Sequence, residues 1–265
     1  MKIAVCVKQV PDAEARLRIR GDGAWIEEEG VTFVLNETDT YAVEEALQIA
    51  ERTGGEVIAF CLGPERAREA VRKVLALGAA RAVFLSDPAL LGGDALATGR
   101  ALAAAIRAEG VDLVLTGSAS TDLGFAATGS VIAGELGWPH AWLVVGVELA
   151  EDRKSVRVTR EMESGMNESS RIALPAVLQV QGGINQPRYA SLKGIMAAKR
   201  KEIRDVAAGD LGIDPSRLGR AGSRLETVSV ALPVSGREVE WIEGDAAAVA
   251  AALVTKLEQE AKVLR

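Results

Sequence analysis

The segment with the greatest capacity for binding chemistry is "GSASTDLGFAATGS", residues 117–130. Its glycines, Gly117, Gly124 and Gly129, allow close approach of the backbone, and serine and threonine hydroxyls lie between them. This composition suits phosphate, which binds to backbone N–H groups at the start of a helix. The segment matches neither the Walker A pattern nor GxGxxG. From the residues alone, a nucleotide-binding loop and a plain Gly/Ser connection both stay open.

A second polar segment, residues 36–39, precedes a helical stretch that begins near Tyr41. Its Asn, Glu, Thr and Asp side chains could contact a ligand, but they could also accept hydrogen bonds from the free N–H groups of the helix. Capping requires no further assumption, and we favour it. Two more loops, residues 8–12 and 62–65, follow apolar runs and are further places where a small ligand could bind.

Neighbouring acidic residues could form a general acid/base pair, and the chain offers Glu44 with Glu45 and Glu161 with Glu163. Neighbouring acids on a helix are usually solvated, and neither pair has a histidine or second catalytic group in support. We therefore do not expect either pair to be catalytic. The single histidine, His140, follows a Trp-Pro dipeptide and is interpreted as a turn residue. One histidine and two cysteines without ligand spacing offer little for metal or triad chemistry.

The elements that must position these residues alternate through the first 145 positions. Short β-branched runs are followed by helical stretches with apolar positions three or four apart, which predicts βαβ units and a parallel sheet. The expected strands are "KIAVCVKQV", "EVIAFCLG", "RAVFLS" and "VDLVLTG", and the expected helices span 41–52, 64–78, 94–108 and a stretch ended by Gly137. Residues 17–34 predict a hairpin excursion. Ligands of such sheets bind beyond the carboxyl ends of the strands.

After Pro139 the pattern changes to "AWLVVGVEL", "SVRVTREME" and "SRIALPAVLQVQ", which predict an antiparallel meander added to the parallel sheet. Residues 204–224 contain few large apolar side chains and predict a linker, or an arm ordered by a partner. A short strand, "ETVSVAL", and an amphipathic helix over 245–264 are expected to end the chain.

Composition limits the classes of function. The 265 residues include 37 acidic and 31 basic ones, and the net charge of −6 argues against nucleic acid as the main partner. Cys6 and Cys61 lie in apolar runs, so we expect no structural disulfide. The N-terminus lacks the apolar region of a signal peptide, and no run reaches the length of a membrane span. We expect a cytoplasmic protein.

The segment "PRYASLKGIMAAKRK", residues 187–201, joins an apolar tip to a basic cluster. The apolar tip consists of Leu192, Ile195 and Met196; the basic cluster consists of Lys193, Lys199, Arg200 and Lys201. From the residues alone, we prefer the interpretation that the apolar tip covers the protein's own core.

The order of the motifs resembles the β subunit of electron transfer flavoprotein, from residue 1 to about 205 and more loosely beyond. These motifs are "VKQVPD", "NETDTYAVEEAL", "CLGP", "TGSASTD", "GWP", "TREMESG", "LPAV" and "NQPRYASLKGIMAAKRK". Residues 160–201 are the most specific part. This chain departs from many relatives at "TDLGFAAT", where they carry an acidic run and an Asn-Gln pair, and at "SLKG", where they carry Leu-Pro-Asn.

The resemblance implies an α/β fold of the adenine nucleotide α-hydrolase-like (Rossmann-like) kind over residues 1–203, with an added meander and a partner-recognition loop at 185–201. Residues 204–265 are then a C-terminal arm and helix that pack on the α subunit. The family keeps AMP as a structural ligand. By resemblance, the AMP site takes Cys6, Asn36, Glu37, Thr38, Asp39, Leu62, Asp122, Leu123, Gly124, Phe125, Ala126, Ala127, Thr128, Gly129, Ser130, Val131, Ile132 and Ala133.

The resemblance also implies a function without turnover by this chain alone. The α subunit holds most of the FAD, which takes electrons from acyl-CoA dehydrogenases of fatty acid β-oxidation, or from other flavin dehydrogenases, and passes them to a quinone oxidoreductase. Docking is assigned to Arg188, Tyr189, Leu192, Ile195 and Met196, with Leu192 as the anchor. One alternative is the bifurcating branch, which binds a second FAD and oxidises NADH. Another is a nucleotide-binding stress-type protein without a redox role.

Overall fold

The computed structural model describes residues 1–233 and 239–264, and the chain divides into two compact units. The first unit consists of Met1–Leu17 and Glu27–Val228, and it contains every residue of the two hydrophobic cores. The second consists of Arg18–Ile26 and the residues from Ser229 onward.

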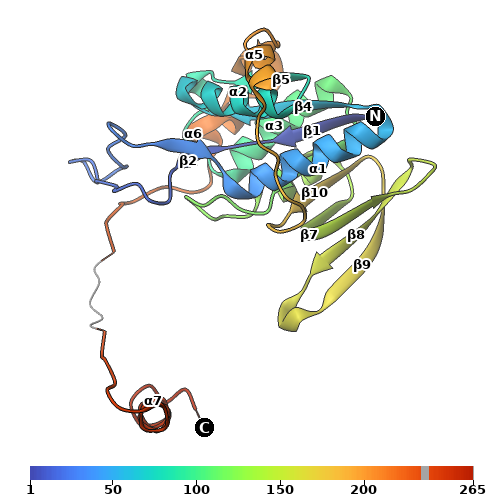
Figure 1. Cartoon of the computed structure of the whole chain (residues 1–265). Coiled ribbons are helices and arrows are strands. Elements are labelled where there is room, and N and C mark those ends of the chain that lie inside the picture. Colours follow the sequence, from blue (N-terminus) through green and yellow to red (C-terminus); the bar gives the residue numbers. More distant parts are fainter. Residues whose placement is uncertain (234–238, 265) are drawn as a thin grey trace. The chain divides into compact units, whose positions relative to one another are not determined.

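The first unit is built on a mixed nine-stranded sheet in the order β11-β5-β4-β1-β6-β10-β7-β8-β9 (Figure 1). All pairs from β11 to β7 are parallel, whereas β7–β8 and β8–β9 are antiparallel. The strands are β1 (Lys2–Cys6), β4 (Glu56–Leu62), β5 (Arg81–Leu85), β6 (Leu113–Gly117), β7 (His140–Leu149), β8 (Ser155–Glu161), β9 (Asn167–Ala173), β10 (Ala176–Val180) and β11 (Ile203–Asp205). A separate small sheet pairs β2 (Gln9–Pro11) with β3 (Phe33–Leu35).

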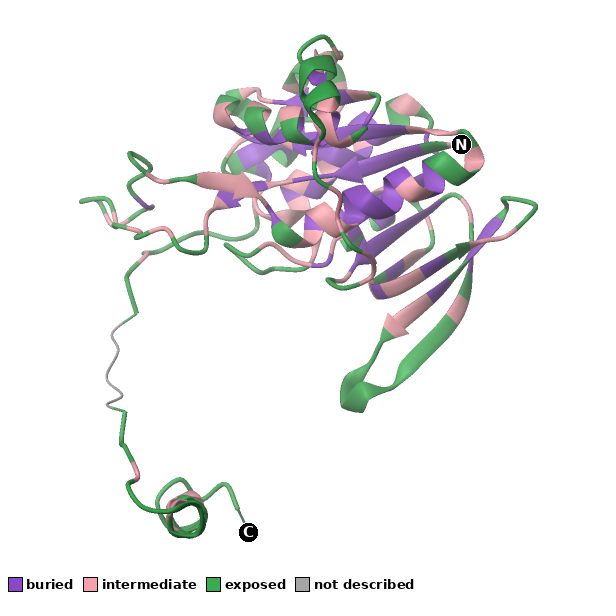
Figure 2. Cartoon of the chain, in the orientation of Figure 1, coloured by how far each residue is buried: buried purple, intermediate pink, exposed green. Residues whose placement is uncertain are grey.

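Helices cover both faces of this sheet, so its central strands are buried (Figure 2). One core lies between the sheet and α1, α2 and α5, and the other between the sheet and α3 and α4. The helices are α1 (Glu37–Thr53), α2 (Arg68–Leu77), α3 (Ala95–Glu109), α4 (Thr128–Leu136), α5 (Leu192–Ala198) and α6 (Gly219–Gly222). Burial on both faces explains why β1, β4 and β6 are almost continuous apolar runs. The predicted Rossmann-like α/β fold is confirmed.

The helices begin and end at residues suited to those positions. Asp94 precedes α3, and its carboxylate accepts a hydrogen bond from Ala97 N at 2.9 Å. Gly54 and Gly110 follow α1 and α3 with φ of 64° and 60°, a left-handed conformation that glycine adopts at little cost. These boundaries place the N-termini of α1, α3 and α4 at the carboxyl edge of the parallel strands.

The prediction that "SRIALPAVLQVQ" forms one strand of the meander is wrong. The segment forms two strands, which are separated by Leu174 and Pro175. β9 pairs with β8 at the edge of the sheet, whereas β10 runs parallel between β6 and β7. All five residues of β10 are buried, which is the pattern of a central strand. The meander therefore consists of β7, β8 and β9 only.

The prediction that residues 204–224 form a linker or arm is also wrong. β11 pairs with β5 as the other edge of the main sheet, and Val206 and Leu218 are buried in the core beside α3. Few apolar side chains suffice here because the segment packs on an existing core. The main unit therefore extends to Val228, which differs from the domain boundary that the sequence predicts at residue 203.

The second unit contains the helix α7 (Ala246–Gln259), which the sequence predicted over 245–264. Asp245 caps it by accepting a hydrogen bond from Ala248 N at 2.9 Å. An antiparallel bridge between Ile19 and Ile26 confirms the turn of the predicted hairpin excursion. The predicted strand "ETVSVAL" is wrong, because its residues have no strand pairing among those described. Within the described residues, no helix is long and apolar enough to cross a membrane.

Candidate functional site

A cavity of about 230 Å³ opens at the carboxyl ends of the central strands. Its lining comes from the ends of β1, β4, β6 and β10 and from the N-terminal turns of α1, α3 and α4. The chain order reverses between β1 and β6: β4 and β5 extend the sheet to one side, and β6 lies on the other. Such a switch point is where open α/β sheets bind ligands.

The N-terminus of α4 is the part of this cavity best suited to an anion. The helix starts at Thr128, and the preceding Ala127 has no side-chain oxygen with which to cap it. Ala127, Thr128 and Gly129 all line the cavity. Uncapped N–H groups at a helix start carry partial positive charge and donate to phosphate or carboxylate oxygens.

Gly129 is required by the close packing of α4 on the sheet. A Cβ at this position would lie 2.5 Å from Cγ of Gln179 on β10 and 2.8 Å from Oγ1 of Thr116 on β6. Both distances are shorter than van der Waals contact, so a side chain at this position would overpack the site. The glycine therefore lets the helix start approach the strand ends that line the cavity.

Gln179 holds residues 117–130, the glycine/hydroxyl loop, to the sheet. Its buried amide donates to the carbonyls of Ser118 (3.3 Å) and Ala126 (3.1 Å), and its Oε1 accepts from Ser130 Oγ (2.9 Å). Nε2 of His140 lies 2.8 Å from the same Oε1. The interpretation of His140 as a turn residue is wrong, because His140 is the first residue of β7. Burial lowers the pKa of His140, which favours its neutral form.

Asp39 is a buried carboxyl group at the start of α1 that lines the cavity. It accepts hydrogen bonds from Lys8 N at 2.7 Å and Gly117 N at 3.2 Å, which join α1 to the ends of β1 and β6. Burial raises its pKa to about 7, although these donors and Asn36 oppose the rise. The group therefore changes charge near neutral pH. Burial also raises the pKa of the Cys6 thiol.

Asn36 does not serve as the side-chain cap that the sequence favoured. Its amide donates to Ala119 O at 3.0 Å and accepts from Thr121 N at 3.1 Å. Thr38 Oγ1 donates to the same Ala119 carbonyl at 2.6 Å. These side chains fasten the loop after β6 instead, because that loop carries backbone groups that the sheet leaves unpaired.

Lys8 supplies the positive charge of the cavity. Its Nζ lies 2.6 Å from Asp122 Oδ1 and 3.3 Å from Ser120 Oγ, both in the glycine/hydroxyl loop. Burial alone would raise the pKa of Asp122, but the hydrogen bonds from Lys8, Ser120 and Leu123 and the charge of Lys8 together outweigh burial and lower the pKa. A bound anion would compete with Asp122 for this ammonium group.

The structure brings ten of the predicted cofactor residues to the cavity wall: Cys6, Asn36, Asp39, Leu62, Leu123, Phe125, Ala126, Ala127, Thr128 and Gly129. The others lie outside the wall: Glu37, Thr38, Asp122, Gly124, Ser130, Val131, Ile132 and Ala133. Ile132 and Ala133 are buried in the core under α4, and Glu37 is exposed on α1. Lys8 belongs to the loop of residues 8–12 that the sequence marked as a possible ligand site. Sequence reasoning missed Thr98 and Gln179, of which Gln179 had a signal: a polar residue inside "AVLQV".

Glu44 and Glu45 are buried on α1, which the rule that neighbouring acids are solvated did not predict. Glu44 is paired with Arg188. Burial alone would raise the pKa of Glu44, but the hydrogen bonds from Arg188 and Gln48 and the charge of Arg188 together lower it. Burial raises the pKa of Glu45. The other pair, Glu161 and Glu163, is exposed. Among the described residues, no group of acidic, histidine and cysteine side chains could hold a metal ion.

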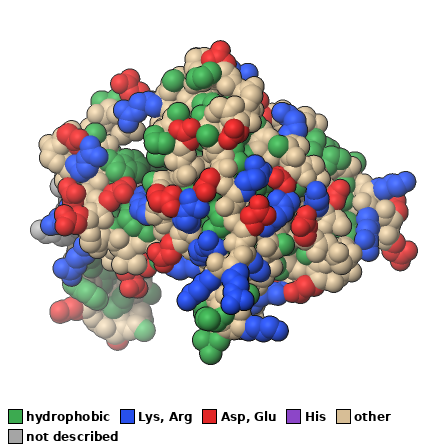
Figure 3. All heavy atoms as spheres, turned by 90° about the horizontal axis from the view of Figure 1, so that it is seen from above, with side chains coloured by type: hydrophobic (Ala, Val, Ile, Leu, Met, Phe, Trp, Pro, Cys, Tyr) green, Lys and Arg blue, Asp and Glu red, His purple; other side chains and the backbone are tan. Residues whose placement is uncertain are grey.

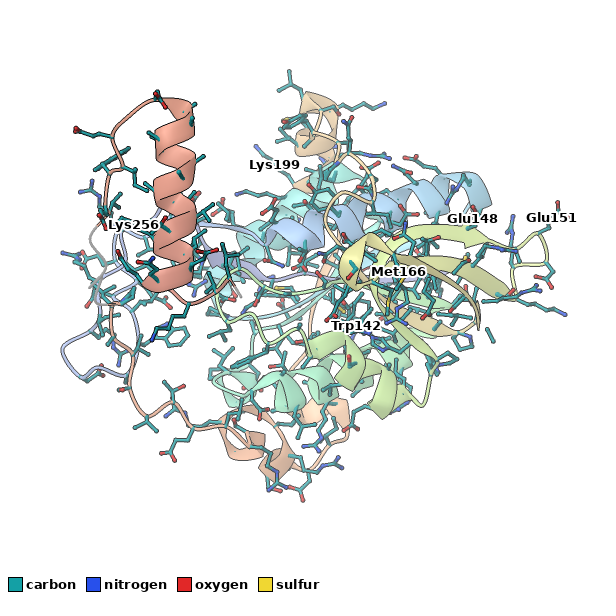
Figure 4. All side chains as sticks on the ribbon, turned by 90° about the horizontal axis from the view of Figure 1, so that it is seen from below. Trp142, Glu148, Glu151, Met166, Lys199 and Lys256 are labelled. Carbon is teal, nitrogen blue, oxygen red and sulfur yellow. The ribbon has the colours of Figure 1, made fainter. Side chains whose placement is uncertain are left out.

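The apolar tip on α5 faces solvent, which overturns the interpretation that it covers the core. Leu192 is 83% exposed, Met196 63% and Ile195 45%, and the neighbouring Tyr189 is 97% exposed. Seen from above, hydrophobic and basic side chains gather on this projection, at the lower edge of Figure 3. Lys199 lies next to α5 where it projects from the unit (Figure 4).

One member of the basic cluster has a different role. Lys201 Nζ donates to the carbonyls of Leu75 (2.9 Å) and Ala79 (2.6 Å) at the end of α2, where a cation complements the helix dipole. The basic residues exposed beside the tip are Lys193, Lys199 and Arg200.

The parallel sheet and its switch-point cavity define an α/β protein with Rossmann-like topology. Comparison with known proteins then gives the family. The electron transfer flavoprotein domain matches residues 24–211. The chain is 40% identical to an electron transfer flavoprotein subunit beta of Methylophilus methylotrophus, covering 96% of this chain and 97% of that protein. It is 38% identical to the subunit beta of Sus scrofa, over 92% of this chain and 94% of that one.

The chain therefore belongs to the electron transfer flavoprotein family and matches its β subunits. Membership makes it part of an electron-carrying flavoprotein and implies an α subunit as its partner.

Proposed function

We propose that this β subunit holds AMP in the switch-point cavity and supports an FAD carried mainly by the α subunit. The observation that carries the proposal is the start of α4: its first residues line the cavity, and Ala127 provides no side-chain cap for their backbone N–H groups. The phosphate of AMP fits these donors, and Lys8 adds a positive charge. Bound AMP would supply structural stabilisation and no reaction step.

The size of the cavity favours AMP over a second FAD. The cavity volume of about 230 Å³ is smaller than the roughly 300–1,000 Å³ of typical ligand pockets, so the smaller of the two ligands suits it better. A mononucleotide is roughly half of a dinucleotide such as FAD. The bifurcating alternative, in which a second FAD occupies this cavity and NADH is oxidised, is therefore the weaker candidate. Leu123 and Phe125, half exposed at the cavity, offer apolar surface to a base.

We further propose that the apolar tip docks flavin dehydrogenases, acyl-CoA dehydrogenases among them, and that electrons pass on to a quinone oxidoreductase. Leu192 is the anchor because it is the most exposed side chain of the tip. Burying one such side chain yields about 1.5–3 kcal/mol, which suits a brief contact. Lys193, Lys199 and Arg200 would speed encounter with an acidic partner more than they add affinity.

The second unit is proposed to pack on the α subunit. Its exposed large apolar side chains include Trp241 (85%), Val239 (76%) and Leu232 (56%). A segment with this composition gains stability when a partner buries it.

Nucleotide extraction from the purified heterodimer tests the proposed ligand. We expect one AMP for each FAD after denaturation and chromatography. Two FAD for each heterodimer without AMP would instead support the bifurcating function.

A further inference from the structure

Arg188 connects residues 185–201, the docking segment, to α1. Its guanidinium makes four hydrogen bonds, two with each of two carboxylates: Glu44 accepts from Nε (2.8 Å) and Nη2 (3.0 Å), and Glu51 accepts from Nη1 and Nη2. The backbone N–H of Arg188 also donates to Glu44, at 3.1 Å. Glu44 and Glu51 are seven residues apart and so lie on one face of the helix.

Asn185, which precedes Arg188 in the docking segment, also binds α1. The side-chain amide of Asn185 donates to the carbonyl of Tyr41 at 3.1 Å and to Glu45 at 3.2 Å. The contacts of residues 185–188 therefore extend along α1 from Tyr41 to Glu51, which is more than two helical turns. This explains why Glu44 and Glu45 are buried although they are charged.

The far end of the docking segment is held by α2. Arg72 Nη1 donates to the carbonyls of Ala198 (2.6 Å) and Lys201 (3.0 Å). Between the two ends, Gly194 packs so closely on α2 that a Cβ there would lie 2.3 Å from Ala76 O. The apolar tip is thus presented on a segment fixed at both ends and in the middle.

We propose that Arg188 is a positioning residue that holds Leu192 in its docking geometry and does not itself contact the dehydrogenase. This inference rests on the proposed docking function of Leu192. The sequence comparison grouped Arg188 with the docking residues, but its side chain is only 33% exposed and its donors face Glu44 and Glu51.

The physical reason is preorganisation. A tip that is already ordered loses little conformational freedom when it enters a partner pocket. Lysine cannot replace Arg188, because an ammonium group lacks the planar fork that binds two carboxylates bidentately. Weaker bonds from residue 188 to Glu44 and Glu51 would let the chain before α5 move. Binding of the partner would then have to order that part of the chain.

Hydrogen exchange of the heterodimer tests positioning without any dehydrogenase. In Arg188→Lys we expect amides of residues 189–198 to exchange about tenfold faster, with nucleotide and FAD content unchanged. Glu51→Gln is the milder second variant, since Glu51 lies on the surface and supplies two of the four bonds. Lys154→Gln, in an exposed turn, is the control that removes one positive charge elsewhere. Unchanged hydrogen exchange in both Arg188→Lys and Glu51→Gln would overturn the proposal.

A double-mutant cycle with Leu192→Ala then separates positioning from direct contact, because coupled residues show non-additive effects. We expect Arg188→Lys to raise the KM for the dehydrogenase reaction about fivefold in the wild-type background and less than twofold when residue 192 is alanine. Equal effects in both backgrounds would contradict positioning through Leu192. If Leu192→Ala alone changes nothing, the docking function fails, and hydrogen exchange still decides whether Arg188 holds the segment.

Discussion

A Cβ placed on Gly129 of α4 would lie only 2.5 Å from Cγ of Gln179 on β10. Because Gly129 has no side chain, α4, the helix that would hold phosphate, can pack directly on β10. The amide of Gln179 on β10 holds the glycine/hydroxyl loop. Gly129 is therefore tied to two tasks, close packing and access of the ligand to backbone N–H groups.

Replacing Gly129 by Ala should lower both nucleotide content and stability. The added methyl forces α4 away from Gln179, and overpacking of this kind costs roughly 1–3 kcal/mol. The matched control is Gly134→Ala in the same helix, where a Cβ meets open space among the described residues. There we expect stabilisation of up to about 1 kcal/mol, because alanine has the higher helix propensity. Full AMP occupancy in Gly129→Ala, measured by chromatography, would move the site elsewhere.

Replacing Leu192 by Ala or Arg should slow electron transfer from the dehydrogenase. Loss of one buried leucine removes about 1.5–3 kcal/mol of docking free energy, roughly a ten- to hundredfold weaker contact. Because Leu192 is exposed here, heterodimer assembly and flavin content should not change. Stopped-flow flavin reduction measures the rate, and Lys193→Gln separates the contribution of charge. Wild-type rates in Leu192→Arg would remove it from the docking surface.

Asp39 should make stability depend on pH. Its folded pKa of about 7 lies above the usual 3.8, so the native state retains a proton that the unfolded chain releases between these values. The contribution of Asp39 is therefore complete below pH 3.8 and is lost as pH rises to about 7, with a slope of about 1.4 kcal/mol per pH unit.

Asp39→Asn cannot titrate at this position and should lack that slope. Denaturant unfolding of the heterodimer at pH 5, 6 and 7, with saturating nucleotide, measures the difference. The advantage of the wild type should shrink as pH rises. Parallel curves for the two proteins would show that Asp39 does not titrate in this range.

Trp241→Ala should weaken binding of the α subunit. Buried tryptophans at interfaces commonly contribute about 2 kcal/mol or more, which corresponds to a roughly thirtyfold increase in Kd. Neither hydrophobic core contains a residue of the second unit, so the main unit should keep its secondary structure. Analytical ultracentrifugation measures Kd, with Glu258→Gln on α7 as the control. An unchanged Kd would remove Trp241 from the interface.

Local sequence patterns predicted the βαβ half of the fold well, because buried parallel strands and amphipathic helices have distinct periodicities. They failed where long-range pairing decides. "LPAVLQV" is β-rich whether it extends a meander or crosses to the centre of the sheet, and only the pairing of β10 with β6 and β7 distinguishes the two. Likewise, β11 and Leu218 use a core that other segments build.

The candidate site was predictable where one segment contributes many residues, as in the loop before α4. Thr98 on α3 and Gln179 on β10 are far apart in the sequence and meet only in the folded chain. The burial of Glu44 and Glu45 depends on Arg188 and Asn185, more than 130 residues away in sequence. Such partners leave no local signal in one sequence.

Native mass spectrometry of the complex, purified at low salt from its own host without added ligand, tests the central claim most directly. Masses are compared before and after denaturation to count bound nucleotides. We predict one copy of this chain, one α subunit, one FAD and one AMP. Two FAD without AMP, or a lone chain that carries ATP or no nucleotide, would contradict the account.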